Sequence, residues 1–304
     1  MSKILISINS NDLFVTIDYS KASSKVINSL KILLLNSSEN AIPTPIGIQI
    51  PWFDLKRILI QVIALIKTDQ STFEFNDFAQ SLIKEYLDDW RNLKKDLKNV
   101  EIDFDAVNPV LESYGFGRKL TKEQIRDCRN LLELKHGANF SVPGAGKTTT
   151  ILAVNTIMSA RGLLNKIFVI CPITAFISWQ DEIKEIFGEG KIKIMKLTTN
   201  IIQNPFLLNT ENPDVILVNY EKLRKDAIKL IPFFLNHKVH IILDESHRIK
   251  SGSNNLSYNE IKKLSDISFR RDILSGTPMP QGINDLISQF DILWSEKLFQ
   301  MWIK

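Results

Sequence analysis

The chain has 304 residues, of which 44% are apolar and 24% are charged, and these are ordinary values for folded globular proteins. They exclude a disordered or fibrous chain, and the length is sufficient for two domains. The most apolar stretch, residues 58–66, is about half as long as a membrane-spanning helix, and the N-terminus does not resemble a signal peptide. Cys128, Cys171 and four histidines provide neither a disulfide framework nor a zinc cluster. We therefore expect a soluble, cytoplasmic protein without a membrane partner.

Charge is distributed unevenly along the chain. Residues 1–115 contain 12 Lys and Arg against 15 Asp and Glu, a net charge of −3, whereas residues 116–304 contain 26 against 19, a net charge of +7. A basic excess suits a surface that meets phosphate groups, although a surplus this small is also common on surfaces that bind nothing.

Residues 1–115 combine strand-type runs, turns and helical stretches. Residues 3–9 and 13–19 predict strands, residues 42–47 predict turns, and two helices follow. In the second helix, the apolar residues recur at spacings of three and four, which is more typical of a core-facing stripe than of a partner groove. These residues are Phe78, Leu82, Ile83, Tyr86, Leu87, Trp90, Leu93 and Leu97. An acidic, irregular segment at 101–112 leads to Gly115, where we predict the end of a smaller α+β domain.

From Leu120 onward, apolar runs alternate with helical stretches, and we predict a second domain at residues 116–304. The predicted strands are residues 166–171, 214–219, 239–243 and 272–275, and the predicted helices include 148–160 and 175–187. In the helix 175–187, one face carries Phe176, Trp179, Ile183, Ile186 and Phe187. Apolar strands that alternate with helices are typical of an α/β fold, a parallel sheet with helices on both faces.

A P-loop pattern opens the helix 148–160. Its residues are Pro143, Gly144, Ala145, Gly146, Lys147 and Thr148, followed by Thr149. The two glycines let backbone N–H groups converge on phosphate oxygens at a helix N-terminus. Lys147 then reaches the β- and γ-phosphates of ATP, and the Thr148 hydroxyl holds Mg²⁺. Ser141 occupies the place of the first glycine of the strict pattern. A turn that only closes a bend is the alternative, but it does not explain the order Lys-Thr.

Two carboxylates end the predicted strand 239–243. Asp244 and Glu245 would complete a site with the P-loop, with Asp244 holding Mg²⁺ and Glu245 orienting and deprotonating the attacking water. Read alone, an Asp-Glu pair at a strand end is often only a solvated turn. Together with the P-loop, it predicts ATP hydrolysis.

Residues 118–295 resemble the first RecA-like lobe of a superfamily-two helicase, specifically of the Swi/Snf-type translocases. Five ordered segments carry the resemblance: Leu120–Gln124; Ile170–Thr174 with Trp179–Ile183; Val218–Glu221; Asp244–Lys250; and Ser275–Pro280. Two positions depart from the family pattern. Ser246 replaces Ala in the Asp-Glu-Ala-His box, and Ser275 replaces the usual Thr of motif III.

The resemblance implies further roles. Gln124 would read adenine, although Thr121 and Gln124 also form a capping-box pattern that explains the same two residue types. His247 would link the nucleotide site to Ser275, Gly276 and Thr277, or it could be a buried core histidine. Contacts to the DNA backbone are implied for Pro172, Ile173 and Thr174 and for Asn219 and Tyr220.

The resemblance also implies that the arginines that stabilise the transition state come from a second RecA-like lobe. This lobe would lie in a longer parent chain or, as the less favoured alternative, in a partner, so the isolated chain should hydrolyse ATP slowly. We predict the motor lobe of an ATPase that moves on double-stranded DNA. A nucleotide-sensing regulatory module is the alternative, and a small-molecule phosphotransferase ranks last. The abundance of Ile, Lys and Asn suggests a prokaryotic or viral source.

Overall fold

The computed structural model of the chain describes residues 3–68, 72–92, 106–197, 206–224, 227–249 and 256–294. The chain divides into two compact units, Met1–Lys95 and Asp96–Lys304. The boundary therefore lies earlier than the predicted one after Gly115. Val107 and Leu111, which precede Gly115, belong to the hydrophobic core of the second unit.

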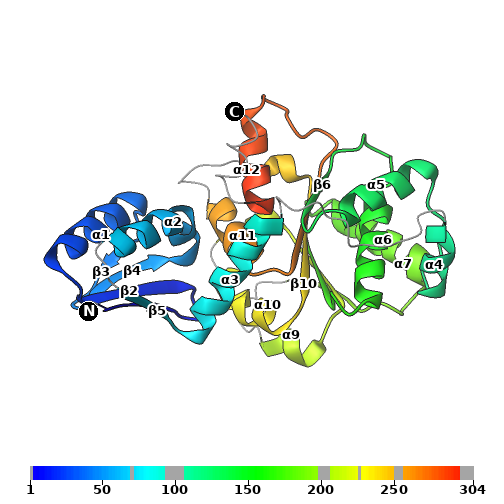
Figure 1. Cartoon of the computed structure of the whole chain (residues 1–304). Coiled ribbons are helices and arrows are strands. Elements are labelled where there is room, and N and C mark those ends of the chain that lie inside the picture. The colour runs from blue at the N-terminus through cyan, green and yellow to red at the C-terminus, as the bar shows by residue number, and fades with distance from the viewer. Residues whose placement is uncertain are drawn as a thin grey trace. The chain divides into compact units, whose positions relative to one another are not determined.

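The first unit has a five-stranded sheet with the order β3-β4-β2-β1-β5 (Figure 1). Strands β1 and β5 pair in parallel, whereas the other neighbours are antiparallel. The elements are β1 Lys3–Ile8, β2 Phe14–Lys21, α1 Ser24–Ser37, β3 Ile42–Pro43, β4 Gly47–Pro51, α2 Trp52–Thr68, β5 Thr72–Phe75 and α3 Asp77–Asn92. This unit is therefore the smaller α+β domain that the sequence predicts.

One face of this sheet is buried. In β1, Ile4, Ile6 and Ile8 alternate with more exposed residues, because successive side chains of a strand point to opposite faces. Helices α1 and α2 cover the buried face (Figure 1) and contribute apolar residues such as Leu30 and Leu59.

The stripe predicted on α3 is confirmed where its side chains are described. Leu82, Ile83 and Tyr86 are buried, and Phe78 is partly buried. Leu87 and Trp90 have no described side-chain environment. Leu93 and Leu97 lie outside the described residues.

The second unit has a six-stranded sheet with the order β6-β11-β10-β7-β9-β8, and every neighbouring pair is parallel. Its strands are β6 Gly137–Asn139, β7 Lys166–Ile170, β8 Ile194–Lys196, β9 Val215–Val218, β10 Val239–Asp244 and β11 Arg270–Leu274. Its helices are α4 Val107–Ser113, α5 Lys122–Leu132, α6 Lys147–Ala160, α7 Ala175–Phe187, α9 Phe206–Glu211, α10 Ile231–Asn236, α11 Leu256–Asp266 and α12 Asn284–Leu293. Single helical turns, η2 Tyr220–Arg224, η3 Ala227–Leu230 and η4 Ser246–Arg248, complete the list.

Helices cover both faces of this sheet (Figure 1). Helices α5, α6 and α7 lie on one side, and α10, α11 and α12 lie on the other. All five residues of β7 are buried, as expected for a strand covered on both faces: Val169 joins the core with α6 and α7, while Phe168 meets Phe234 of α10 at 5.0 Å between ring centroids. The predicted α/β fold, a parallel sheet with helices on both faces, is thus confirmed.

The sequence predicts four of the six strands, at β7, β9, β10 and β11, and it predicts the bounds of α7. It misses the short outer strands β6 and β8. Helix α4 begins within residues 101–112, a segment predicted to be irregular. Cys128 and Cys171 are both free and buried. Among the described residues, no helix is long and apolar enough to cross a membrane.

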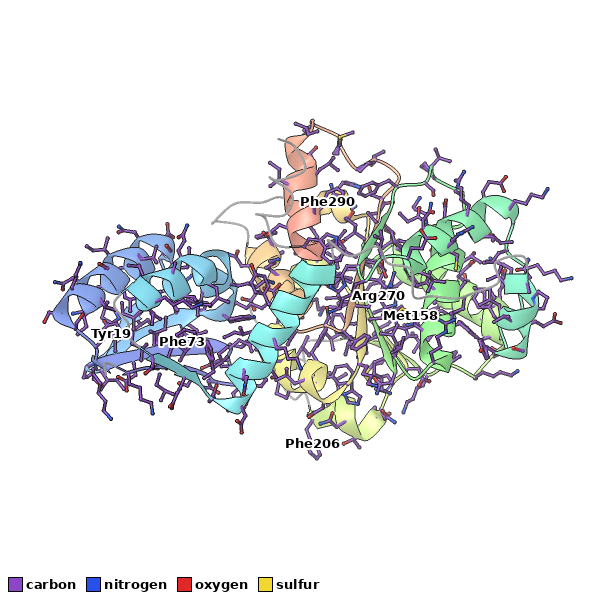
Figure 2. The ribbon with its side chains drawn as sticks, in the orientation of Figure 1. Tyr19, Phe73, Met158, Phe206, Arg270 and Phe290 are labelled. Atoms are coloured by element: carbon purple, nitrogen blue, oxygen red, sulfur yellow. The ribbon has the colours of Figure 1, made fainter. Side chains whose placement is uncertain are left out.

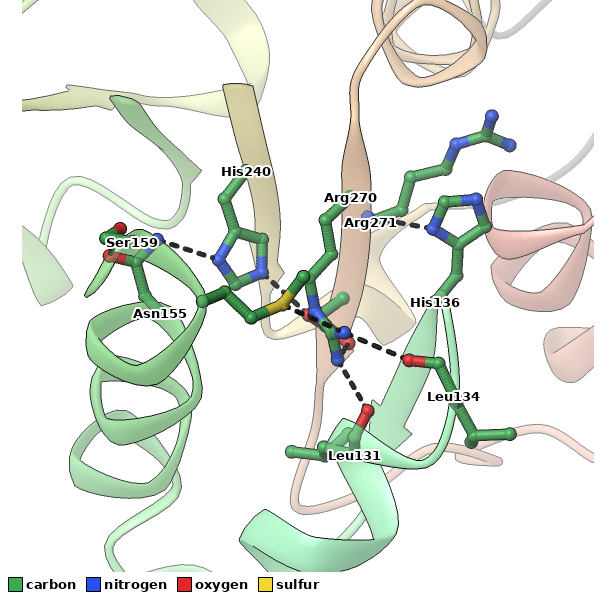
Figure 3. A network of polar contacts seen from close by, with 10 residues as sticks. Leu131, Leu134, His136, Asn155, Ser159, His240, Arg270 and Arg271 are labelled. Atoms are coloured by element: carbon green, nitrogen blue, oxygen red, sulfur yellow. Dashed lines mark hydrogen bonds and ion pairs between the residues drawn. The ribbon is translucent and has the colours of Figure 1, made fainter. Parts of the chain in front are cut away.

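A buried polar network joins the strands to the helices that flank the P-loop (Figure 3). Asn155 of α6 contacts His240 Nδ1 at 3.2 Å, His240 Nε2 contacts Asp272 Oδ2 at 2.6 Å, and Arg270 Nη2 donates to Asp272 Oδ1 at 3.0 Å. Arg270 also donates to the Leu131 carbonyl near the end of α5 at 2.8 Å. The network therefore fixes α5, α6, β10 and β11 relative to one another.

Arg270 is 1% exposed and lies within the second unit near Met158 (Figure 2), whose Sδ is 3.4 Å from Arg270 Nη1. Burial alone would raise the pKa of Asp272, but the charge of Arg270 and the hydrogen bond from His240 hold the pKa of this carboxyl below its usual value. Burial lowers the pKa of His240, which favours the neutral ring. A buried arginine is thus paired with a buried carboxylate, as physical chemistry requires.

Candidate functional site

The motif loops lie at one edge of the parallel sheet, because each follows the carboxyl end of a strand. The P-loop follows β6, the Ser275–Thr277 segment follows β11, and Glu245 follows β10. The Pro172 loop follows β7, and Asn219 follows β9. The fold thus brings five separate sequence segments to one edge. Ligands of open α/β sheets bind at this edge.

The P-loop has the backbone of an anion-binding turn. Gly144 and Gly146 have φ values of 82° and 78°, in the left-handed region that glycine adopts without a steric penalty. Helix α6 begins directly afterwards at Lys147. The ammonium of Lys147 donates to the carbonyl oxygens of Ser141 at 3.0 Å and Val142 at 3.3 Å. These bonds hold the lysine head over its own loop.

Gln124 contacts both the start of its own helix and the P-loop. Its Oε1 accepts from the Thr121 N–H at 3.0 Å and its backbone N–H donates to Thr121 Oγ1 at 3.3 Å, so the capping box is present. Its Nε2 donates to the Ala145 carbonyl of the P-loop at 3.2 Å. The structure therefore brings Gln124 to the P-loop. Its contact with adenine stays a prediction.

The two threonines at the start of α6 differ in their surroundings. Thr148 is partly buried, whereas Thr149 is 1% exposed. The Thr149 hydroxyl donates to Glu182 of α7 and accepts from Arg118 Nη1 at 3.2 Å. The side chain of Thr149 thus joins two helices inside the unit, so its predicted part in ATP binding would have to come from its backbone N–H.

The Asp244 carboxylate is held by two donors. Trp179 Nε1 donates to Oδ2 at 2.9 Å, and the Glu245 N–H donates to Oδ1 at 3.0 Å. Burial raises the pKa of Asp244, and the Glu245 charge acts in the same direction, while the two hydrogen bonds and the Lys147 charge oppose the shift. The sequence places Trp179 on the apolar face of α7 and in the Trp179–Ile183 segment of the resemblance, but no spacing rule connects residue 179 with residue 244.

Glu245 has a strained backbone. Its φ and ψ are 54° and 49°, which places a non-glycine residue in the left-handed region. Its side chain is 42% exposed, and its Oε2 lies 3.2 Å from His247 Nδ1. Backbone strain of this kind occurs at functional sites when the surrounding structure enforces it.

His247 connects the Asp244–His247 box to motif III. Its Nδ1 is 2.9 Å from Ser275 Oγ and 3.5 Å from Thr277 Oγ1, and Ser275 Oγ also accepts from the Thr277 N–H at 3.2 Å. The imidazole is partly exposed, so His247 is not a fully buried core histidine. The structure brings these predicted residues together.

Gly276 approaches the P-loop closely. A Cβ atom built on Gly276 would lie 2.9 Å from Cγ of Pro143 and 3.1 Å from its Cδ. Any side chain at position 276 would therefore push against the P-loop. This contact joins motif III to the nucleotide loop.

Ser246 and Gln289 form a buried link that sequence reasoning missed. Ser246 Oγ donates to Gln289 Oε1 at 2.7 Å, and Gln289 Nε2 donates to the carbonyl oxygens of Pro278 at 2.7 Å and Asp285 at 2.8 Å. Both side chains are fully buried. The substitution of Ser for Ala in the box was the available signal, since a buried hydroxyl requires a polar partner.

The first predicted DNA-contact segment presents two residues to solvent. Pro172 is buried, whereas Thr174 is exposed and Ile173 is 63% exposed. Helix α7 begins directly after Thr174, which makes no side-chain cap. This segment therefore offers an exposed loop at a helix N-terminus.

The side chains of the second predicted DNA-contact segment point into the protein. Asn219 Nδ2 donates to Glu221 Oε2 at 2.9 Å, and the Tyr220 hydroxyl donates to the Asp244 carbonyl at 2.7 Å. Burial raises the pKa of Tyr220 well above its usual value, and the charge of Asp244 adds to the shift. Only the backbone of this segment can therefore serve the predicted contact in this arrangement.

The residues present fit a magnesium-bound nucleotide. Among the described residues, no group of three or more His, Cys, Asp or Glu side chains could hold a metal by itself. Mg²⁺ usually takes one or two carboxylates together with phosphate oxygens, and Asp244 and Thr148 match this donor set. The positive-φ glycines and Lys147 suit the phosphates.

The curated proteins that are similar to this chain include two with long alignments. DNA repair and recombination protein RAD54B of Mus musculus is 27% identical over 159 residues, which cover 49% of this chain and 17% of the mouse protein. TATA-binding protein-associated factor BTAF1 of Arabidopsis thaliana is 30% identical over 166 residues, which cover 52% of this chain and 8% of the plant protein. The matches thus span less than a fifth of these relatives, whose animal and plant sources do not support the expected prokaryotic or viral origin.

Among solved structures, the SWI2/SNF2 ATPase core of Sulfolobus solfataricus in complex with dsDNA has 23% sequence identity and a TM-score of 0.48, covering 60% of this chain and 37% of that chain. The SNF2-related domain family matches residues 140–303, which include the P-loop, the Asp244–His247 box and Ser275–Thr277. Because the family match covers more than half of the 304 residues of this chain, the chain belongs to the SNF2-related domain family.

Proposed function

We propose that this chain is the first motor lobe of a DNA-dependent ATPase, which couples ATP hydrolysis to movement on double-stranded DNA. The observation that carries the proposal is the placement of five motif loops at the carboxyl edge of one parallel sheet. Membership of the SNF2-related domain family supports it. A P-loop alone would support only nucleotide binding.

In the proposed site, the backbone N–H groups of Gly144 and Gly146 and the ammonium of Lys147 bind the phosphates of ATP. Lys147 exchanges the carbonyl oxygens of Ser141 and Val142 for phosphate oxygens. Asp244 and Thr148 hold Mg²⁺, which when bound neutralises phosphate charge. Gln124 reads the adenine from the start of α5.

Glu245 acts as the general base. Its partly exposed carboxylate orients the attacking water and accepts a proton from it. His247 lies 3.2 Å from this carboxylate and 2.9 Å from Ser275, so it transmits the position of motif III to the base. Gly276 adds a second connection, since it packs against Pro143 of the P-loop.

Two segments bind the DNA backbone in this proposal, Pro172–Thr174 and Asn219–Tyr220. They use backbone N–H groups and a helix N-terminus, so the contacts position the duplex without reading its sequence. We further propose that arginines of a second RecA-like lobe, in a parent chain or a partner, stabilise the transition state. The chain by itself should then bind ATP and hydrolyse it slowly.

The test is the rate of ATP hydrolysis by the longest native protein that contains this chain, measured with and without duplex DNA. A motor lobe predicts stimulation by the duplex. Normal ATP binding without stimulation would contradict the motor proposal and favour a nucleotide-sensing regulatory module. Transfer of phosphate to a small acceptor in place of water would favour a phosphotransferase.

A further inference from the structure

Asp244, the proposed Mg²⁺ ligand, is held by two buried aromatic side chains. Trp179 donates its indole N–H to the carboxylate Oδ2 at 2.9 Å, and Tyr220 donates its hydroxyl to the backbone carbonyl of the same residue at 2.7 Å. Trp179 is 1% exposed and Tyr220 is 6% exposed. One bond fixes the orientation of the carboxylate, and the other fixes the backbone that carries it.

One aromatic residue follows a segment that is proposed to contact DNA, and the other belongs to such a segment. Trp179 lies in the second turn of α7, about 7.5 Å along the helix axis from Thr174 at a rise of about 1.5 Å per residue. Tyr220 begins the helical turn η2 and is itself part of the Asn219–Tyr220 segment. The two bonds therefore reach Asp244 from the helix that follows one proposed DNA-contact segment and from within the other.

The strand order places both segments near the Asp244 turn. Strand β7 pairs with β10, and β9 pairs with β7, so at the sheet edge the segment after β7 is next to the Asp244 turn and the segment after β9 is one strand further. The Trp179 N–H and the Tyr220 hydroxyl each donate to one acceptor, and both side chains are largely shielded from solvent. A displacement of either segment by about 1 Å would lengthen a bond whose strength falls steeply with distance and angle.

We propose that Trp179 and Tyr220 are positioning residues that couple DNA binding to the affinity for Mg²⁺·ATP by fixing Asp244. The inference rests on the proposed function. Phosphate contacts that restrain the loop at Pro172–Thr174 and the backbone at Asn219–Tyr220 also restrain the two donors, so Asp244 has less orientational freedom to lose when it binds Mg²⁺. By linkage, Mg²⁺·ATP strengthens DNA binding by the same factor.

The experiment measures this factor directly as the ratio of Mg²⁺·ATP dissociation constants without and with a short duplex, by calorimetry on the full chain. Trp179→Phe and Tyr220→Phe each remove one donor and keep an aromatic ring. Couplings between sites are typically 5- to 150-fold, so we expect a ratio of roughly this size in the unaltered chain and a fall toward one in each variant.

Matched controls remove equivalent groups elsewhere. Trp52→Phe changes another buried tryptophan, in the first unit, and Tyr258→Phe removes another buried tyrosine hydroxyl, which donates to Asp291. Both controls should keep the ratio of the unaltered chain. A merely structural role of Trp179 or Tyr220 would alter stability, monitored by urea unfolding, but would leave the ratio unchanged.

The two possible failures are distinguishable. A ratio above one in the unaltered chain that persists in Trp179→Phe and Tyr220→Phe overturns the coupling and leaves the proposed function standing. A chain that binds Mg²⁺·ATP but not the duplex contradicts both. If Trp179→Phe does not fold, Tyr220→Phe decides alone, because loss of one hydroxyl keeps the packing of the ring.

Discussion

Ser246 Oγ donates a 2.7 Å hydrogen bond to Gln289 Oε1 inside the second unit, where neither side chain reaches solvent. Both N–H groups of the Gln289 amide are also used, on the carbonyl oxygens of Pro278 and Asp285. The bond ties the Asp244–His247 box to the segment after motif III. A second link, the contact between His247 Nδ1 and Ser275 Oγ, joins the box to motif III itself.

Removing the serine hydroxyl should destabilise the fold. Ser246→Ala leaves Gln289 Oε1 buried without a donor, which costs about 1–3 kcal/mol of unfolding free energy. Ser246→Ala combined with Gln289→Leu removes both partners and should recover part of this loss. The measurement is a double-mutant cycle by urea unfolding. Equal destabilisation by the single and the double variant would show that the pair does not interact.

Substitutions of Lys147 and Glu245 should affect different steps, ATP binding in one case and ATP hydrolysis in the other. Lys147→Ala should abolish Mg²⁺·ATP binding, because the ammonium supplies the charge that meets the β- and γ-phosphates. Glu245→Gln should retain binding and stop hydrolysis, since an amide cannot accept the proton. Calorimetry and phosphate release check the two effects in the longest native protein. Turnover that survives Glu245→Gln would require a different base.

Gly146 tests whether Gln124 supports the P-loop. A Cβ on Gly146 would lie 2.2 Å from Gln124 Nε2, so Gly146→Ala should displace the amide from the Ala145 carbonyl and weaken Mg²⁺·ATP binding. Gly162→Ala is the control, because Gly162 also has a positive φ of 69° but has nothing within 4 Å of its Cβ position. Both variants carry backbone strain of about 1 kcal/mol. Only Gly146→Ala should also lose nucleotide affinity.

Stability should fall as the pH falls from 7 towards 5. The folded-state pKa of His240 is below its unfolded value of about 6.5, so the unfolded chain takes up a proton that the folded chain refuses. Asp272, whose pKa is lowered, loses its contribution only at more acidic pH. Urea unfolding at several pH values, compared with His240→Gln, checks this. The variant should show a weaker pH dependence, and an unchanged one would contradict the assignment.

The parts of the fold that the sequence predicts are those with a strong apolar period. Strand β10 and helix α7 appear where the pattern places them, because burial on both faces or on one face leaves a clear signature. Strand β6, with the residues Gly137, Ala138 and Asn139, has no such signature. It exists because it pairs with β11, which is more than 130 residues distant in the sequence.

The site was predictable only where one segment carries its own chemistry. The P-loop and the Asp244–Glu245 pair are local patterns, and the structure brings them to the same sheet edge. The bonds from Trp179 and Tyr220 to Asp244 depend on how α7 and η2 pack, and no spacing rule describes this packing. Tyr220 shows the difference most clearly, since its segment was predicted to contact DNA and its side chain reaches Asp244 instead.

At Glu245 the fold and the proposed reaction favour different residues, because the backbone is in the left-handed region. Its φ of 54° suits glycine or asparagine, and a glutamate held there carries strain of roughly 1–3 kcal/mol. A library randomised at this position and sorted only by thermal stability should therefore become enriched in glycine and asparagine. Retention of glutamate under selection for ATP turnover would show that the reaction requires this side chain against the preference of the fold.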